Sequence, residues 1–404
     1  MASIYLNGIT SNKFDPPTLV VFLPQEHSAW CSQFAEEGYN VIQLHYSASS
    51  LSASLDGLLQ RVARYLASVD WALLTYGIND SDCKTLYHGF ASSEYIEISR
   101  FKCAIHFSPL AEDGHDLLYI NQEGRHIPTT VHLAASQEKL QASFTLLRTP
   151  DGLGYTLPTS AYHPVEVYTY PLVSASPPWP LLTKPPVSLK SGQSPSQDPY
   201  IQAATGLSYT RTLQLLRREL GPHFDLEQLW EQHTYYEFVE RDAPSEFLST
   251  IVASPYVNHI PTMTGGVGYD DLARFYKYHF TRVDVTPPDT EMITVSRTVG
   301  ADRIIDEMIF KCTHTTEIDW LVPGIKPTGK PLEIALVGVV AFRGDKLTFE
   351  YWDQASVLVQ LGILDDSKLP VAGAEVARKA INPFGLPSNR LMARWSSSKG
   401  LSID

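Results

Sequence analysis

One segment of the chain alternates apolar and ionisable residues in a way that could place an acid in a pocket. Residues 302–314 read DRIIDEMIFKCTH, and side chains at positions i, i+2 and i+4 of a strand share one face. The more apolar face consists of Asp306, Met308, Phe310, Cys312 and His314. A carboxyl group among Met and Phe side chains should have a raised pKa, which suits proton transfer. We therefore predict Asp306 as the principal acid or base, with Met308, Phe310 and His314 against the substrate.

This pattern also has a structural interpretation. Asp306 could pair with a buried neighbour such as His314 or Arg303 and take no part in chemistry.

A second acid follows in KLTFEYWDQ, residues 346–354. We predict Asp353 as the complement of Asp306, because two opposed carboxylates can divide the roles of acid and base. Trp352 and Tyr351 are predicted to contact the substrate. Glu350 is a competing acid, since a single bulge would exchange the two faces of the strand, but a solvated edge charge is the interpretation we favour for it.

Tyr256, Asn258 and His259 form a third group of candidates. Tyr and Asn side chains can fix a water molecule while a carboxylate removes its proton, and the adjacent His could orient a substrate oxygen. The alternative is that Tyr256 and Asn258 merely cap a turn into the next helix.

Charge and composition limit the classes of partner. The 404 residues carry 31 Lys and Arg against 44 Asp and Glu, a formal net charge of −13 at pH 7. Such a chain repels phosphate backbones and anionic lipid surfaces, so we expect neither nucleic acid nor membrane as a partner. No signal peptide or membrane span is recognisable, which predicts a cytoplasmic protein. Without zinc-ligand spacing or a glycine-rich nucleotide motif, we predict no metal and no cofactor.

The elements that must position these residues fall into two regions. Residues 1–221 alternate strand and helix patterns, which predicts a doubly wound α/β domain with a parallel sheet. Strands are expected at 18–24, 38–46, 84–90, 101–110, 127–136 and 165–172, and helices at 31–38, 50–74 and 208–221. Residues 172–200 are rich in Pro and Ser and are expected to form a loop or linker.

Residues 222–404 place helices before long strands, which predicts an α+β domain with a curved sheet forming a cone. Helices are expected at 225–241, 245–253 and 270–280, and strands at 292–300, 302–317 and 330–354. Helix-like residues 355–364 and 372–382 in the tail should cover the open sheet or the partner domain.

The first region resembles the dienelactone hydrolase family, of the α/β-hydrolase type, in the strand that runs into Gln25-Glu26 and in the helix and strand that follow. The resemblance implies a nucleophile elbow, which we place at 89–93, where Ala91 occupies the position of the nucleophile. It also implies an orienting acid at Gln137 and a catalytic His at Ala175. None of these residue types can perform its role, so we predict a non-catalytic scaffold, cap or dimer contact. A shifted pair of Ser92 and His88 would point away from the oxyanion hole.

The second region resembles the SnoaL-like family of the nuclear-transport-factor-2 superfamily over about residues 225–365. The likeness rests on the PTGK turn, the GDK hairpin and the strand ending in WDQ. It implies a cone-shaped α+β fold and a homodimer through this domain. Family members include polyketide ring cyclases, steroid isomerases, limonene-type epoxide hydrolases and non-catalytic proteins. Tyr256-x-Asn258 resembles the water-holding pair of the epoxide hydrolases, although Ile304 replaces the arginine of that set.

We therefore predict a cofactor-independent acid/base enzyme of specialised, polyketide-like metabolism. It would open an epoxide or form a ring on a hydrophobic, oxygenated small molecule, and aldol-type cyclisation or isomerisation could use the same groups without the water. A non-catalytic binding or assembly protein is the alternative from another class. An active ester or lactone hydrolase is the third.

Overall fold

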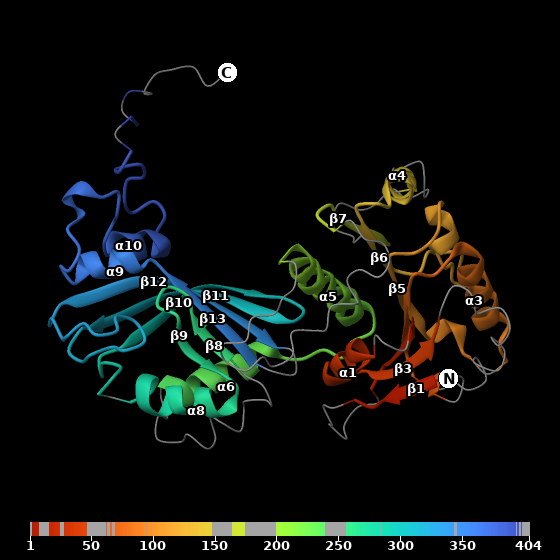
Figure 1. Ribbon diagram of the computed structural model, residues 1–404, viewed down its shortest axis with the longest axis horizontal. Coiled ribbons are helices and arrows are strands. Elements are labelled where there is room, and N and C mark those ends of the chain that lie inside the picture. The colour runs from red at the N-terminus through yellow and green to blue at the C-terminus, as the bar shows by residue number, and fades with distance from the viewer. Residues whose placement is uncertain are drawn as a thin grey trace. The chain divides into compact units, whose positions relative to one another are not determined.

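A computed structural model describes residues 2–7, 16–24, 28–46, 62, 65–66, 69–94, 96–147, 164–173, 199–238, 256–282, 284–342, 346–392, 394–395 and 397. The chain forms two compact units (Figure 1). The first unit ends at Phe224 and the second begins at Asp225. The expected loop at 172–200 and the expected helix at 245–253 lie largely or wholly outside the described residues.

The first unit is built on a seven-stranded sheet in the order β1-β3-β2-β4-β5-β6-β7. Its strands are β1 (Ala2–Tyr5), β2 (Thr18–Leu23), β3 (Asn40–His45), β4 (Trp71–Tyr76), β5 (Phe101–Phe107), β6 (Thr129–Ala134) and β7 (Val165–Tyr170). β1 is antiparallel to β3, whereas β2 to β7 run parallel to their neighbours. A parallel sheet buried on both faces explains the nearly continuous apolar runs of these strands.

Helices cover both faces of this sheet. The α-helices among the described residues of the unit are α1 (Ala29–Glu36), α3 (Asp80–Ser92), α4 (Glu138–Leu147) and α5 (Pro199–Glu219). On one face, Leu86 of α3 and Phe144 of α4 belong to the same buried cluster as Val20 and Phe22 of β2. On the other face, Trp30 of α1 packs edge-on against Phe107 and against a ring of α5. The sheet is therefore doubly wound, as the alternation of strands and helices predicts.

The expected strand at 84–90 is wrong, because these residues lie inside α3. Cys83, Leu86 and Phe90 recur at helical spacing and are the residues of α3 that enter the core. Asn79 caps the helix by accepting a hydrogen bond from the backbone N–H of Asp82. The expected helix at 50–74 is also wrong at its end, because Trp71 begins the buried strand β4.

α5 closes the first unit, as expected, and a buried ion pair holds it there. Arg217 donates to Glu37 at 2.8 Å, and Tyr209 donates to the other oxygen of the same carboxylate at 2.8 Å. Arg217 also donates to the backbone carbonyl of Glu37. The helix ends before Gly221, whose φ of +76° is the left-handed conformation that glycine adopts at helix C-termini.

The second unit contains a six-stranded sheet in the order β10-β11-β12-β13-β8-β9. Its strands are β8 (Tyr256–His259), β9 (Thr264–Val267), β10 (Glu291–Val299), β11 (Arg303–Thr313), β12 (Pro331–Phe342) and β13 (Lys346–Trp352). All pairs are antiparallel except β13 with β8. The expected strand ranges 292–300, 302–317 and 330–354 correspond to β10, β11 and the pair β12 and β13, although β11 ends at Thr313. β8 and β9 were not predicted, because four residues each give too short a pattern.

Different helices lie on the two sides of this sheet (Figure 1). They are α6 (Leu226–Phe238), α8 (Tyr269–Phe275) with a π-helical turn at Tyr276–Phe280, α9 (Gln354–Gln360) and α10 (Glu375–Ile381). α6 and α8 lie on the side that carries the buried residues of β11, which we call the inner face. Arg378 of α10 binds Glu333 on the outer face. The tail therefore packs on the sheet, as expected.

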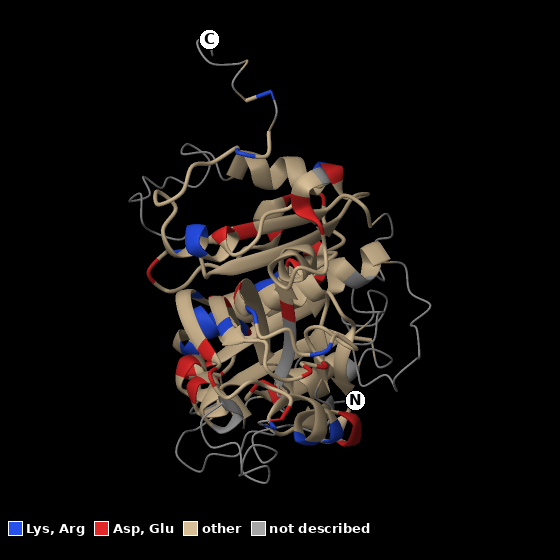
Figure 2. Cartoon of the chain, turned by 90° about the vertical axis from the view of Figure 1, so that its left-hand side faces the viewer, with Lys and Arg blue, Asp and Glu red and all other residues tan. Residues whose placement is uncertain are grey.

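Charged residues of both signs are interspersed along the described parts of the chain in Figure 2. Among the described helices, none combines the length and the apolar character needed to cross a lipid bilayer.

Candidate active site

The register of the second sheet brings one polar row together on its inner face. Residues paired across neighbouring strands point to the same side of a sheet. The row runs through all six strands as Arg297, Asp306, Gly338, Glu350, His259 and Thr264. The inward-facing set predicted from β11 is buried, with Asp306 only 1% exposed. The row has two ends that differ in chemistry, with Gly338 between them.

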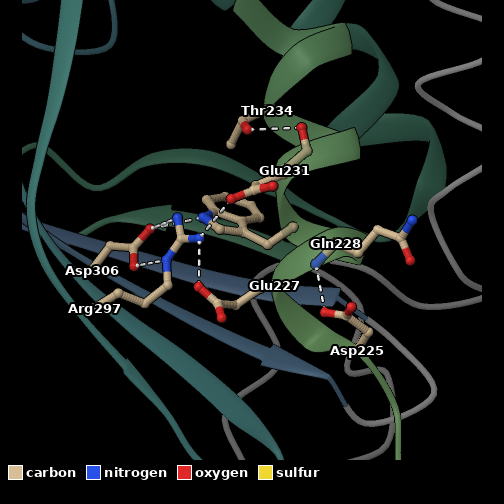
Figure 3. Close-up of polar contacts among 8 residues, drawn as sticks. Asp225, Glu227, Gln228, Glu231, Thr234, Arg297 and Asp306 are labelled. Carbon is tan, nitrogen blue, oxygen red and sulfur yellow. Dashed lines mark hydrogen bonds and ion pairs between the residues drawn. The ribbon is translucent and has the colours of Figure 1, made fainter.

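At one end, the Asp306 carboxylate is held by a cation and an indole. Arg297 donates to it through Nε at 2.7 Å and through Nη2 at 2.8 Å, and Trp230 of α6 donates from Nε1 at 2.9 Å. Arg297 also lies 3.3 and 3.4 Å from Glu227 and Glu231 of α6 (Figure 3). Its hydrogen bonds with Asp306 raise the pKa of Arg297 above the usual range.

This arrangement fits the ion-pair interpretation of Asp306. Three of the roughly four acceptor positions of the carboxylate are occupied by strong donors, which leaves little capacity to accept a substrate proton. The partner is Arg297, and the expectation of His314 or Arg303 is wrong. Arg303 binds its neighbour Asp302 at 2.9 Å instead.

At the other end, His259 and Glu350 face each other. Nε2 of His259 lies 3.3 Å from Oε2 of Glu350, and the side chains are 1% and 13% exposed. Despite this proximity, Nε2 makes no hydrogen bond of good geometry to any residue that the structure describes. Glu350 is the residue that the sequence favoured as a solvated edge charge, and this expectation is wrong, because the backbone pairs it directly with His259.

Hydroxyl groups lie on the other side of the His259 ring. Oγ1 of Thr264 lies 3.0 Å from Nδ1 of His259 and 2.9 Å from the carbonyl oxygen of Trp320. The Thr262 hydroxyl lies 3.0 Å from that of Thr264 and donates to the same carbonyl at 2.8 Å. Nδ1 of His259 is therefore held by a hydroxyl group, while Nε2 faces Glu350.

Aromatic rings enclose His259. The ring centroids of Phe275, Phe280, Trp320 and Trp352 lie 5.0 to 5.7 Å from that of its imidazole. Phe275 and Phe280 come from α8 and the π-helical turn after it, and both pack in one buried cluster with Met308 and Phe310. The imidazole is therefore fixed in position, and Glu350 is the more accessible member of the pair.

Three of the predicted site residues do not join this row. Asp353 is exposed and caps α9, because its Oδ1 accepts from the backbone N–H groups of Ala355 and Ser356. The strand ends at Trp352, so Asp353 belongs to a helix start and not to the pocket face. Tyr256 and Asn258 alternate with His259 on β8 and so lie on the outer face. The structure therefore does not bring these two side chains together with Asp306 or Glu350.

The residues predicted to contact the substrate also lie in different parts of the second unit. Met308, Phe310 and Trp352 lie on the inner face and are buried. Tyr351 is 43% exposed on the outer face. His314 is buried, but eight residues of extended strand, about 26 Å, separate it from Asp306. Its Nδ1 accepts from the backbone N–H of Thr328, so it serves the turn that follows β11.

In the first unit, the predicted elbow is not a strand-to-helix turn. Ala91 and Ser92 are exposed in the last turn of α3, and Ser92 donates to the carbonyl of His88 at 2.6 Å. Gln137 has a structural role, because it accepts from the N–H of Ala134 and donates to the carbonyl of Pro109. Ala175 and the Gln25-Glu26 loop lie outside the described residues.

Four residues of the site were not predicted from the sequence: Arg297, Trp230, Thr264 and Trp320. A signal existed for Arg297, because a two-residue hairpin turn at Ala301-Asp302, between Gly300 and Arg303, places it opposite Asp306. Trp230 and Trp320 come from distant segments, and no local pattern indicates them. Within the described ranges, no cluster of three or more His, Cys, Asp or Glu residues could hold a metal ion.

Comparison with known proteins gives a partial match. No protein-family model matches the chain. No curated protein matches it either. A solved structure from Jannaschia sp. CCS1 that carries the provisional name SnoaL-like polyketide cyclase is 12% identical, covers 36% of this chain and 99% of its own, and has a TM-score of 0.27.

Two further solved structures match to a similar extent. One, from Catenulispora acidiphila, is a hypothetical protein with a ketosteroid isomerase-like fold. It is 12% identical to this chain, the match covers 35% of this chain and 96% of the other, and the TM-score is 0.26. An NTF2-like protein of unknown function from Burkholderia pseudomallei is also 12% identical, covers 34% of this chain and 95% of its own, and has a TM-score of 0.25. These values concern the fold of about a third of the chain and carry no argument about activity.

Proposed function

We propose that the second unit is a cofactor-independent acid/base catalyst that moves a proton at a carbon atom next to a carbonyl group. Its substrate is an apolar small molecule, and the net reaction is a ring closure or an isomerisation. The observation that carries the proposal is the His259–Glu350 pair, in which a nearly buried carboxylate faces an imidazole nitrogen that lacks a hydrogen bond of good geometry to any described residue.

Glu350 is the catalytic residue in this proposal, and His259 is the positioning residue behind it. Glu350 is the more exposed of the two and has no described partner for its other carboxylate oxygen. A general base needs an accessible lone pair, and a neighbour that shares the proton allows the base to take it up and to release it again.

The reaction balances without an external reagent. Glu350 removes a proton from the carbon atom, and the electron pair of the broken C–H bond forms an enolate. In an isomerisation the pair returns the proton to another carbon atom. In an aldol-type ring closure the carbanion attacks a second carbonyl of the same molecule, and the resulting alkoxide takes the proton. The proton is therefore conserved within the pair and the substrate.

Opening of an epoxide by water has less support. That chemistry needs a side-chain set that holds the water next to the base, and Tyr256 and Asn258 lie on the opposite face from Glu350. We therefore favour chemistry without a bound water.

Hydrogen–deuterium exchange of 2-tetralone, an apolar bicyclic ketone, tests the proposal. The protein should accelerate exchange at the carbon between the ring and the carbonyl, measured by proton NMR. Glu350→Gln keeps the size of the side chain but removes its basicity, so the acceleration should fall about 100-fold or more. Glu307→Gln changes an exposed carboxylate on the outer face and should leave the rate unchanged. Equal rates for Glu350→Gln and the unaltered protein would exclude Glu350 as the base.

Binding without chemistry is the second candidate function. It is favoured by the extent to which the inner face is filled by its own side chains, with aromatic rings around His259 and an ion pair on Asp306. In that case apolar ligands would bind, but no exchange of 2-tetralone above the buffer rate would be seen.

A further inference from the structure

Thr264, at the end of the polar row, connects the His259 ring to a backbone carbonyl. Its Oγ1 contacts both Nδ1 of His259 and the carbonyl oxygen of Trp320. Oγ1 of Thr262 contacts the same carbonyl oxygen and also Oγ1 of Thr264. Four contacts of hydrogen-bond length therefore join three oxygen atoms and one ring nitrogen, and the carbonyl oxygen among them can only accept.

The number of hydrogens available decides how many of these contacts can be hydrogen bonds. Each threonine supplies one hydroxyl hydrogen, and His259 supplies a third if its Nδ1 carries one. With this third hydrogen, Nδ1 donates to Thr264 and both hydroxyl groups donate to the Trp320 carbonyl, which satisfies three of the four contacts. Without it, two pairs of acceptor atoms face each other with no hydrogen between them. The cluster is therefore better satisfied when Nδ1 is a donor.

The opposite nitrogen of the ring gives the same indication. A hydrogen on Nε2 would have no acceptor in good geometry among the described residues, although Oε2 of Glu350 lies 3.3 Å away. A hydrogen on Nδ1 has such an acceptor in Thr264. Because His259 is buried, an N–H group without a partner would cost free energy there. Both sides of the ring therefore favour a hydrogen on Nδ1.

We propose that Thr264, backed by the Trp320 carbonyl, is the positioning residue that keeps a hydrogen on Nδ1 of His259. In the neutral ring, the lone pair of Nε2 then faces Glu350 and accepts a hydrogen bond from that side chain after it has taken a proton from carbon. Glu350 later returns the proton to the substrate, so no further reagent is consumed. The place of the hydrogen depends on the geometry alone, whereas its use in catalysis rests on the proposed function.

NMR on protein labelled with ¹⁵N-histidine tests where the hydrogen lies. A ring nitrogen that carries a hydrogen and one that bears a lone pair differ widely in ¹⁵N chemical shift. His259→Gln identifies the signals of this residue by their loss. In the unaltered protein, Nδ1 of His259 should carry a hydrogen. A bare Nδ1 with the hydrogen on Nε2 would overturn the inference, whether or not the protein catalyses exchange.

Three variants separate positioning from packing. Thr264→Val keeps the shape of the side chain but removes the hydroxyl group, so Nδ1 should lose its hydrogen. Exchange of 2-tetralone should then fall at least about tenfold, the scale known for residues that orient metal-binding histidines. Thr264→Ser keeps the hydroxyl group and should keep both properties. Thr298→Val makes the same exchange at an exposed position on the outer face of β10, and as the matched control it should change neither property.

A hydrogen that stays on Nδ1 in folded Thr264→Val, with an unchanged rate of exchange, would refute the role of Thr264. If this variant does not fold, the ¹⁵N shifts of the unaltered protein and of Thr264→Ser decide.

Failure of the positioning role and failure of the proposed function give different results. Exchange that requires Glu350 but is unaffected by Thr264→Val keeps the function and removes the role of Thr264. A hydrogen on Nδ1 that depends on the Thr264 hydroxyl group, in a protein that catalyses no exchange, keeps the arrangement of the ring and removes the catalysis.

Discussion

The two units bury their histidines differently. In the first unit, His106 has Thr75 at 2.7 Å from Nδ1 and the carbonyl of Leu117 at 3.1 Å from Nε2. His132 likewise has a hydroxyl group 3.1 Å from each ring nitrogen. In the second unit, His259 has one such partner, and its other nitrogen faces a carboxylate without a good hydrogen bond. Nε2 of the buried His314 also has no described hydrogen bond, but no ion pair of His314 is described. Buried polar groups are normally satisfied, and the facing carboxylate is what points to His259 as the place where chemistry or binding can occur.

The same contrast separates the two acids of the polar row. Asp306 and Glu350 lie on the same face of one sheet, each one strand away from Gly338. Asp306 already accepts three hydrogen bonds from Arg297 and Trp230, whereas no hydrogen bond to the Glu350 carboxylate is described. The type and burial of a carboxylate therefore do not identify a base, because the donors already bound to it decide whether it can accept a proton.

The largest effect that would sharpen this comparison is expected from Asp306→Asn. The exchange leaves Arg297 without its bidentate partner in a site where that side chain is only 17% exposed. Removal of one member of a buried ion pair costs about 3–5 kcal/mol when the remaining charge is uncompensated. Here Glu227 and Glu231 stay 3.3 and 3.4 Å from Arg297 and compensate part of its charge. We therefore expect the free energy of unfolding, measured by urea denaturation, to fall by about 3 kcal/mol, the lower end of that range.

Glu307→Gln is the matched control, since this acid is the next residue on β11 but lies on the outer face and is exposed. Its effect should stay within about 0.5 kcal/mol, as for most surface substitutions. If Asp306→Asn were as stable as the unaltered protein yet lost exchange of 2-tetralone, Asp306 would be the base and the contrast between the two acids would be wrong.

A second effect concerns the satisfied histidines. Burial lowers the pKa of His106 from 6.5 to about 4, although its hydrogen bond to the Leu117 carbonyl opposes the shift. Burial also lowers the pKa of His132, and the charge of Arg211 adds to this. The unfolded chain takes up protons below pH 6.5, whereas folded His106 stays neutral down to about pH 4. The first unit should therefore lose roughly 3 kcal/mol of stability from His106 as the pH falls from about 6.5 to 4.

His106→Gln separates this contribution from that of the carboxylates, which also lose favourable interactions in acid. The variant should be less stable at pH 7 but should show a shallower loss of stability between pH 6.5 and 4. Urea denaturation at a series of pH values gives the slope. The same slope in both proteins would mean that His106 is protonated in the folded state.

Much of the fold follows from local patterns, and the exceptions have local reasons. The apolar runs at 18–24, 38–46 and 101–110 are buried parallel strands, as predicted. The run at 84–90, KTLYHGF, is less apolar than these and is too short to distinguish a strand from a helix. Asn79 followed by two acids in Asp80-Ser81-Asp82 is a helix start, and it would have corrected the prediction.

The site was less predictable, because it depends on register and on pairing between distant segments. The period of β11 gives its buried face, but only the hairpin turn at Ala301-Asp302 gives the partner of Asp306. Glu350 meets His259 through the parallel pairing of β13 with β8, for which no adjacent residues provide a signal. The dienelactone hydrolase likeness, the homodimer and the cytoplasmic location stay predictions.

The smallest effect is expected from Ser92→Ala, which tests whether the first unit is catalytically silent. A nucleophilic serine needs an adjacent base and oxyanion donors, whereas Ser92 is exposed in a helix and uses its hydroxyl hydrogen on the carbonyl of its own helix at His88. Loss of this bond at an exposed position should change stability by less than about 0.5 kcal/mol and leave exchange of 2-tetralone unchanged. A fluorophosphonate that acylates active serines should label neither protein. Labelling that disappears in Ser92→Ala would restore a hydrolase in the first unit and would reverse the contrast between the two units.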